Sequence, residues 1–173
     1  MSEEESQEHV FLLISNIDLP EVYNGKIVYK SFAYITYHNH LLVFSQPYAP
    51  EAGIQVPAGT IEKNEHPEKA VLREAFEETG LKGLTLNYFL GEHERDMSDF
   101  GRDEIHHRYF YHLQYHREPV SIWQHEELYH SSEPGLEPII FEFSWVPLSH
   151  GIPALIADHG IMLPRLLEIL YAH

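Results

Sequence analysis

The chain has 173 residues, 43% of them hydrophobic and 22% charged, values that suit one globular domain with a substantial core. The net charge of -16 argues against a nucleic-acid partner, because nonspecific binding to a phosphate backbone needs a basic surface. The lack of cysteine excludes disulfides, and without a secretory signal or an apolar run of about 18 residues we expect a cytoplasmic protein that does not cross a membrane.

The first part of the chain predicts a flexible tail followed by β-strands. Residues 1–9 are polar and acidic and should be flexible, which leaves 10–173 as a single domain. Segments 30–37 and 41–45 are rich in aromatic and β-branched residues and flank a short polar turn, so they predict a hairpin. A loop with two prolines and a glycine separates this hairpin from a short apolar strand predicted at 54–56.

The sequence pattern then changes from the period of a strand to that of a helix. From Pro67 to Thr79 apolar residues recur at helical spacing, and Gly80 suits the left-handed residue after the last turn. Strands are predicted at 84–92, 105–115 and 139–146, a loop at 117–138, and a helix at about 158–172. Together these elements predict an α+β fold with a mixed sheet between helices, although periodicity alone is compatible with several such architectures.

Four glutamates cluster around the predicted helix. Glu65 lies just before it, whereas Glu74, Glu77 and Glu78 stand at i, i+3 and i+4 and therefore share one face. Like charges at this spacing, near the C-terminal end of a helix, destabilise it, and bound cations would relieve the repulsion. Carboxylate oxygens are suitable ligands for Mg²⁺ or Mn²⁺. Taken by itself, however, such a run is more often a solvated acidic face.

Segment 59–81 (GTIEKNEHPEKAVLREAFEETGL) resembles the Nudix box. Ala75 stands where the box usually has a larger aliphatic residue, a departure at a packing position. Upstream, Val56-Pro57-Ala58 is similar to the strand and turn that precede the box in this family. The box positions that match are Gly59, Glu65, Arg73, Glu74, Glu77, Glu78, Gly80 and Leu81.

This resemblance implies a Nudix-type α/β/α sandwich with a mixed β-sheet between helices. It also implies hydrolysis of a pyrophosphate bond that depends on Mg²⁺ or Mn²⁺. In that family pattern Glu74 and Glu78 would coordinate the metal, and Glu77 would bind it directly or through water. Arg73 and Glu65 would form an internal pair that fixes the loop against the helix, with a weak surface ion pair as the alternative.

A general base would remove a proton from the attacking water. The resemblance leaves its identity open, because some members of the family use a helix glutamate and others a carboxylate from a later loop. The candidates in this chain are Glu74 and, in later segments, Asp103, Glu104, Glu126 and Glu127.

Candidate substrate contacts are concentrated in segment 93–110. We hypothesise that one or two of Arg95, Arg102 and Arg108 contact substrate phosphates, the alternative being that they balance neighbouring acidic residues. Markers of hydrolases for ADP-ribose, dinucleoside polyphosphates and coenzyme A are not matched. The expected substrate is a nucleoside diphosphate linked to another moiety, or a nucleoside triphosphate. Aromatic residues that could stack a base or belong to the core are Tyr88, Phe100, Tyr109 and Phe110.

Two other functions share the motif. One is a catalytically inactive Nudix-fold module that binds a nucleotide or has a regulatory role, although such modules usually lack some of the box glutamates. The other is a prenyl diphosphate isomerase, which relies on a catalytic cysteine that this chain does not have. Resemblance to the family also suggests a homodimer.

Overall fold

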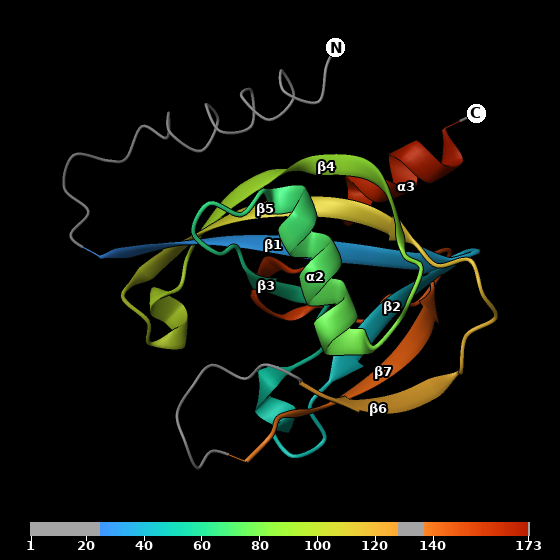
Figure 1. Cartoon of the computed structure of the whole chain (residues 1–173), viewed down its shortest axis with the longest axis horizontal. Coiled ribbons are helices and arrows are strands. Elements are labelled where there is room, and N and C mark those ends of the chain that lie inside the picture. The colour runs from blue at the N-terminus through green and yellow to red at the C-terminus, as the bar shows by residue number, and fades with distance from the viewer. Residues whose placement is uncertain (1–24, 128–136, 173) are drawn as a thin grey trace.

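The computed structural model describes residues 25–127 and 137–172, so the tail predicted at 1–9 lies outside the described part. Seven strands form one sheet (Figure 1), in which six follow the order β4-β5-β1-β2-β7-β6 and β3 pairs with β1. The strands are β1 (Lys26–Tyr37), β2 (His40–Ser45), β3 (Ala58–Thr60), β4 (Thr85–Asp96), β5 (Glu104–Gln114), β6 (Ile122–Glu126) and β7 (Ile140–Pro147). The helices of the described part are α2 (Pro67–Thr79) and α3 (Leu163–Tyr171), with the 3₁₀ helices η1 (Pro50–Ala52), η2 (Ser98–Phe100) and η3 (Ile156–Asp158).

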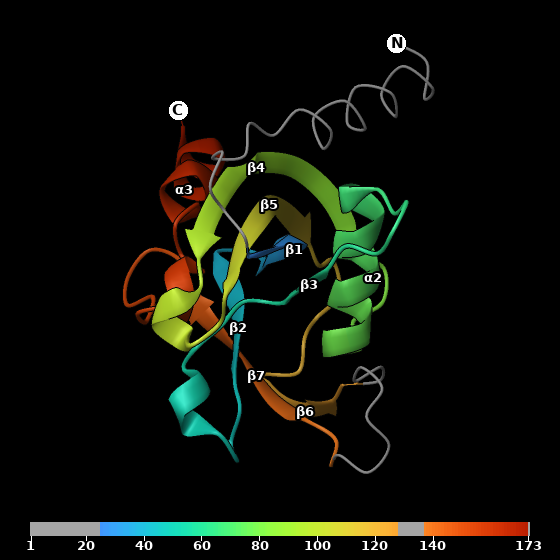
Figure 2. The same ribbon diagram turned by 90° about the vertical axis from the view of Figure 1, so that its left-hand side faces the viewer.

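The sheet separates the two α-helices (Figure 2). β1 and β5 run parallel and the other paired strands run antiparallel, so the sheet is mixed. Ile35 of β1 packs in the core cluster that contains Val71 of α2, whereas Phe32 packs in the cluster that contains Leu166 of α3. The predicted α+β sandwich with a mixed sheet between helices is confirmed.

Strand β1 changes its neighbour along its length. Near its end it pairs with β2, where Thr36 lies opposite Leu41. Closer to its start it pairs instead with β3, where Ser31 lies opposite Gly59. Meanwhile β2 pairs with β7 from His40 to Ser45. This change of partner places β3 against both β1 and α2.

The hairpin and the helix at 67–79 are confirmed, but the strand predicted at 54–56 is wrong. Ile54 and Gln55 form only isolated bridges, to Leu155 and Phe44 respectively. Because neighbouring residues bond to different segments, no continuous ladder forms there. The strand in this part of the chain begins at Ala58, two residues after the end of the predicted segment.

Two later predictions also differ from the structure. The loop predicted at 117–138 contains β6, a short edge strand that pairs with β7, a non-local partner that local sequence patterns do not reveal. The final helix begins at Leu163 rather than near residue 158, where Ala157 and Asp158 have left-handed backbone conformations, with φ of 49° and 59°, that do not fit an α-helix. Neither α2 nor α3 has the length and apolar character needed to cross a membrane, and the same holds for every other helix of the described part.

Candidate active site

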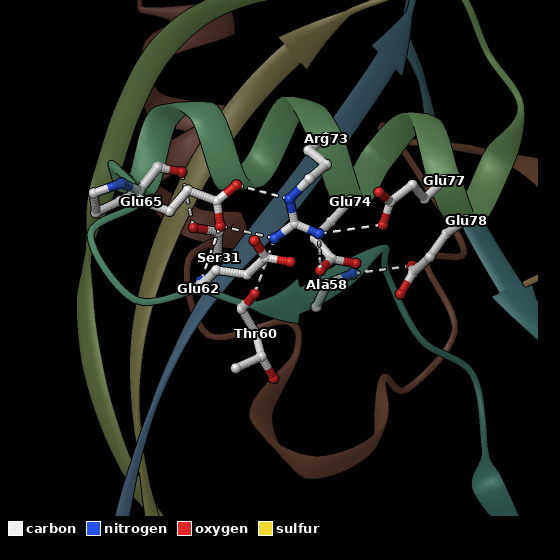
Figure 3. A network of polar contacts seen from close by, with 10 residues as sticks. Ser31, Ala58, Thr60, Glu62, Glu65, Arg73, Glu74, Glu77 and Glu78 are labelled. Atoms are coloured by element: carbon white, nitrogen blue, oxygen red, sulfur yellow. Dashed lines mark hydrogen bonds and ion pairs between the residues drawn. The ribbon is translucent and has the colours of Figure 1, made fainter. Parts of the chain in front are cut away.

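Helix α2 begins and ends where its sequence predicts. Pro67 starts the helix, where its missing N–H costs no hydrogen bond, and its carbonyl accepts a hydrogen bond from the buried Ser31 Oγ at 2.9 Å. At the other end Gly80 has a φ of 73°, and its N–H donates to the Phe76 carbonyl. The bond from Ser31 joins the start of the helix to β1, and the acidic face lies beside β3 (Figure 3).

Arg73 links the loop before α2 to glutamates on the helix (Figure 3). Its Nε and Nη2 donate to the two carboxylate oxygens of Glu65 at 2.7 and 2.8 Å. Its Nη1 donates to Glu74 at 2.6 Å and to Glu77 at 3.2 Å, and Nη2 also reaches the Thr60 carbonyl at 3.1 Å. Hydrogen bonding from Arg73 lowers the pKa of Glu65. The Arg73 and Glu65 side chains are 26% and 14% exposed, so this pair is more enclosed than a solvated surface pair.

The backbone of β3 lies directly against the Glu74 carboxylate. A Cβ built on Gly59 would lie 1.9 Å from Glu74 Cδ and 2.1 Å from its Oε2, distances that no side chain could accommodate. Burial raises the pKa of Glu74, and the hydrogen bond from Arg73 opposes that effect. The glycine at this position therefore allows the carboxylate to pack on the strand.

Glu78 is almost completely buried, with 6% of its surface exposed. Its Oε2 accepts a hydrogen bond from the backbone N–H of Ala58 at 3.1 Å. Burial raises the pKa of Glu78 well above its usual value, and the charge of Glu74 adds to the increase. A cation bound beside these two carboxylates would favour their ionised forms.

The carboxylates of α2 are close together without forming a complete metal site. Figure 3 shows the Glu74 and Glu78 carboxyl groups next to the Ala58 backbone, while Arg73 contacts Glu74 and Glu77. Among residues 25–127 and 137–172, no three His, Asp or Glu side chains converge closely enough to hold a metal ion by themselves.

A cavity of about 960 Å³ opens beside these glutamates, within the size range of small-molecule sites. Acidic and basic side chains both line it, together with several aromatic rings. The acidic lining residues are Glu51, Glu62, Glu74, Glu77, Glu78 and Glu127, and the basic ones are Lys30, Arg73, Arg102, Arg108, His106 and His159.

The three arginines proposed as phosphate contacts have different surroundings. Arg102 and Arg108 line the cavity, whereas Arg95 is not among the lining residues and pairs with Asp99 at 2.7 Å and Asp158 at 3.3 Å. Arg102 is exposed. Arg108 is 1% exposed, and burial lowers its pKa to about 10. The structure thus separates Arg95, which balances neighbouring acids, from the other two.

The candidate bases and aromatic residues also differ in whether they line the cavity. Besides Glu74, the cavity lining includes Glu127 but none of the other proposed bases, Asp103, Glu104 and Glu126. Phe100 is the one proposed stacking residue in the lining. The others lie elsewhere: Tyr88 is exposed on β4, and Tyr109 and Phe110 belong to the core.

Lys30 and His159 line the cavity and were not predicted from the sequence as site residues. Lys30 lies on a strand, where lysine usually marks a solvated edge, so the sequence did not indicate that it lines the cavity. His159 accepts a hydrogen bond from the Val56 N–H through Nδ1 at 3.3 Å, and burial lowers its pKa to about 3. Only the three-dimensional packing brings these residues to the glutamates of α2.

Comparison with known proteins agrees with this architecture. The NUDIX domain model matches residues 30–166. A MutT protein from Methanosarcina mazei Go1 is 17% identical, with a TM-score of 0.60 over 86% of this chain and 98% of that one. A UDP-X diphosphatase is 14% identical, with a TM-score of 0.59 over 100% of this chain and 73% of that one.

A NUDIX family hydrolase from Clostridium perfringens is 20% identical, with a TM-score of 0.55 over 82% of this chain and 97% of that one. At these identities the structural matches show a shared fold. No curated protein matches the sequence closely enough to count as a relative. The domain match covers most of the chain and includes the loop, helix and cavity described above, so the chain belongs to the Nudix family.

Proposed function

We propose that this chain is a metal-dependent hydrolase that cleaves a pyrophosphate bond in a nucleotide-like substrate. The observation that supports this most strongly is the pair of carboxylates, Glu74 and Glu78, enclosed at the wall of a cavity large enough for a nucleotide. Two neighbouring buried carboxylates are costly unless a cation compensates their charge. Membership of the Nudix family supports a hydrolase acting on phosphorus anhydrides.

The residues at this wall suit a hard divalent cation. Glu74 and Glu78 would hold it, and Glu77 would contribute directly or through water, because carboxylate oxygens suit Mg²⁺ or Mn²⁺. When bound, the cation would neutralise phosphate charge and lower the pKa of a bound water. Arg73 and Glu65 would hold the preceding loop so that the glutamates keep their positions.

The chain itself must also accept a proton from the attacking water. We favour Glu127 as this base, because it lines the cavity and its charge acts on Glu78. It would take the proton as the water oxygen forms its bond to phosphorus and the bridging oxygen leaves. Glu74 is the second candidate, since burial raises its pKa toward the range in which a carboxylate is a better base.

The substrate class remains a nucleoside diphosphate linked to another moiety, or a nucleoside triphosphate. One structural relative is described as a UDP-X diphosphatase, but at 14% identity the match supports the shared fold rather than a shared substrate. The alternative function is an inactive module that binds a nucleotide or regulates. The presence of Glu74, Glu77 and Glu78 favours catalysis over this alternative.

The test is release of phosphate or nucleoside monophosphate from a panel of nucleoside triphosphates and nucleoside diphosphate conjugates. The panel is run with Mg²⁺, with Mn²⁺ and with EDTA. We expect turnover of one class that needs metal, and a loss in kcat of about a hundredfold or more for Glu127→Gln. Glu118→Gln, an exposed carboxylate outside the cavity lining, is the control. Metal binding without turnover of any member would favour the inactive module.

Two broader expectations belong to the same proposal. The enzyme would act in the cytoplasm and would form a homodimer. Light scattering of the purified full chain gives the mass in solution, and a monomer at working concentrations would refute the dimer without affecting the proposed reaction.

A further inference from the structure

Lys30 places a positive charge inside the cavity. Its side chain is partly buried and lines the cavity wall. No ion pair joins its ammonium group to a carboxylate within the described ranges, in contrast to Arg73, Arg95 and Arg102. Burial lowers the pKa of Lys30, because enclosure disfavours the charged ammonium group. An enclosed cation is unfavourable unless an anion binds beside it.

The charges around Lys30 divide into two groups. Glu78 and Glu74, on α2, act on it as anions, whereas Arg108 and Arg102 act on it as cations. In the parallel register of β1 and β5, Lys30 lies directly opposite Arg108. Lys30 therefore lies beside the basic wall formed by β5 and the segment before it, and the charges of the α2 glutamates also act on it.

The two arginines of the basic wall already have partners. Arg108 donates to the Ala157 carbonyl at 2.5 Å, and its guanidinium lies 4.9 Å from the centre of the Phe32 ring. Arg102 lies 3.5 Å from the Glu104 carboxylate. Among Lys30, Arg102 and Arg108, Lys30 is thus the cation for which the described residues supply no such partner, so it is available to bind an incoming anion.

We propose that Lys30 forms an anion subsite on the cavity wall near the glutamates of α2 and binds a phosphoryl oxygen of the substrate there. The inference rests on the proposed function, in which one phosphoryl group lies beside Glu74 and Glu78. An oxygen of that group, or of the phosphoryl group linked to it, would then reach Lys30. The ligands that fit are those with linked phosphoryl groups, as in the proposed substrates.

The experiment measures binding of imidodiphosphate, a pyrophosphate analogue with a nitrogen bridge, by calorimetry in the presence of Mg²⁺. Wild type is compared with Lys30→Met and Lys30→Arg, and Lys82→Met serves as the exposed control. We expect Lys30→Met to weaken binding about tenfold or more, as loss of a charge-assisted hydrogen bond would, and Lys30→Arg to recover part of it. Lys82→Met should bind as wild type does.

A second readout separates the subsite from general damage to the site. Mn²⁺ affinity, measured by electron paramagnetic resonance, should be unchanged or tighter in Lys30→Met, because the variant loses a positive neighbour of Glu78. Lys30→Gln is the second variant if the methionine protein does not fold.

Equal imidodiphosphate binding by wild type and a folded Lys30 variant would overturn the inference, as would absence of binding by wild type. Failure of the proposed function has a different signature. In that case wild type would turn over no nucleotide, yet imidodiphosphate binding would still depend on Lys30.

Discussion

Gly59 and Glu74 approach so closely that the space of a Cβ at residue 59 is already filled by the Glu74 carboxyl group, at 1.9 Å from its Cδ. Gly59→Ala should therefore displace this carboxylate, lower the free energy of unfolding by about 1–3 kcal/mol and reduce activity. Denaturant unfolding in the wild-type and Glu74→Ala backgrounds measures the coupling. The loss of unfolding free energy caused by Gly59→Ala should be much smaller in the Glu74→Ala background. Equal losses in both backgrounds would contradict the close packing.

Glu78 should make the metal-free protein less stable as pH rises. Burial raises the pKa of Glu78 in the folded protein above its usual 4.5. At pH values between 4.5 and this raised pKa, the folded state holds more protons than the unfolded state. The free energy of unfolding therefore falls as pH rises through that window, and Glu74 contributes in the same direction.

Glu78→Gln removes this charge, so with EDTA at pH 8 it should be more stable than wild type by about 1 kcal/mol or more. Urea unfolding at pH 5 and pH 8 measures the difference, with the exposed Glu118→Gln as control. Mg²⁺ should stabilise wild type more than the variant. A variant that is less stable than wild type at pH 8 would show that the Glu78 charge is compensated within the protein.

Arg73 should not be replaceable by lysine. Its guanidinium bonds both oxygens of Glu65 and also reaches Glu74, a geometry that a single ammonium cannot reproduce. We expect Arg73→Lys to lower the free energy of unfolding by about 1–3 kcal/mol and to reduce activity. Arg165→Lys, at an exposed ion pair with Glu168, is the matched control and should change stability little. Similar melting curves for both variants would contradict a special role for the guanidinium group of Arg73.

Arg108 should act mainly by holding the cavity wall. It is buried, stacks on Phe32 and donates to the carbonyl of Ala157, a residue in the left-handed region. Arg108→Lys should lower the free energy of unfolding by about 1–3 kcal/mol, whereas the exposed Arg102→Lys should leave it nearly unchanged. Thermal unfolding of both variants measures these changes in stability. An Arg108→Lys protein that is as stable as wild type but binds substrate more weakly would instead make this residue a direct substrate contact.

The helix and its acidic face could be predicted because the signals are local. The limits of α2 follow from Pro67 and Gly80, and the spacing of Glu74, Glu77 and Glu78 fixes their common face without knowledge of the rest of the fold. The Nudix-type sandwich could likewise be expected from this one segment.

Features that depend on contacts between distant segments could not be predicted. β6 lies in a proline-flanked stretch and becomes a strand by pairing with β7. The role of Lys30 depends on its place beside Arg108 in the parallel pair of strands. For Arg95 the alternative interpretation, that it balances neighbouring acids, anticipated its contact with Asp99, whereas the contact with the distant Asp158 depends on the folded chain.

The measurement that tests the central claim most directly compares kcat/KM of wild type, Glu78→Gln and the exposed control Glu118→Gln with saturating Mg²⁺ on the best nucleotide substrate. Removing the buried carboxylate should lower kcat/KM by about a thousandfold, equivalent to several kcal/mol of lost transition-state stabilisation, while the control stays near wild type. Wild-type activity in a correctly folded Glu78→Gln protein would contradict the claim that Glu78 takes part in a metal-dependent hydrolysis.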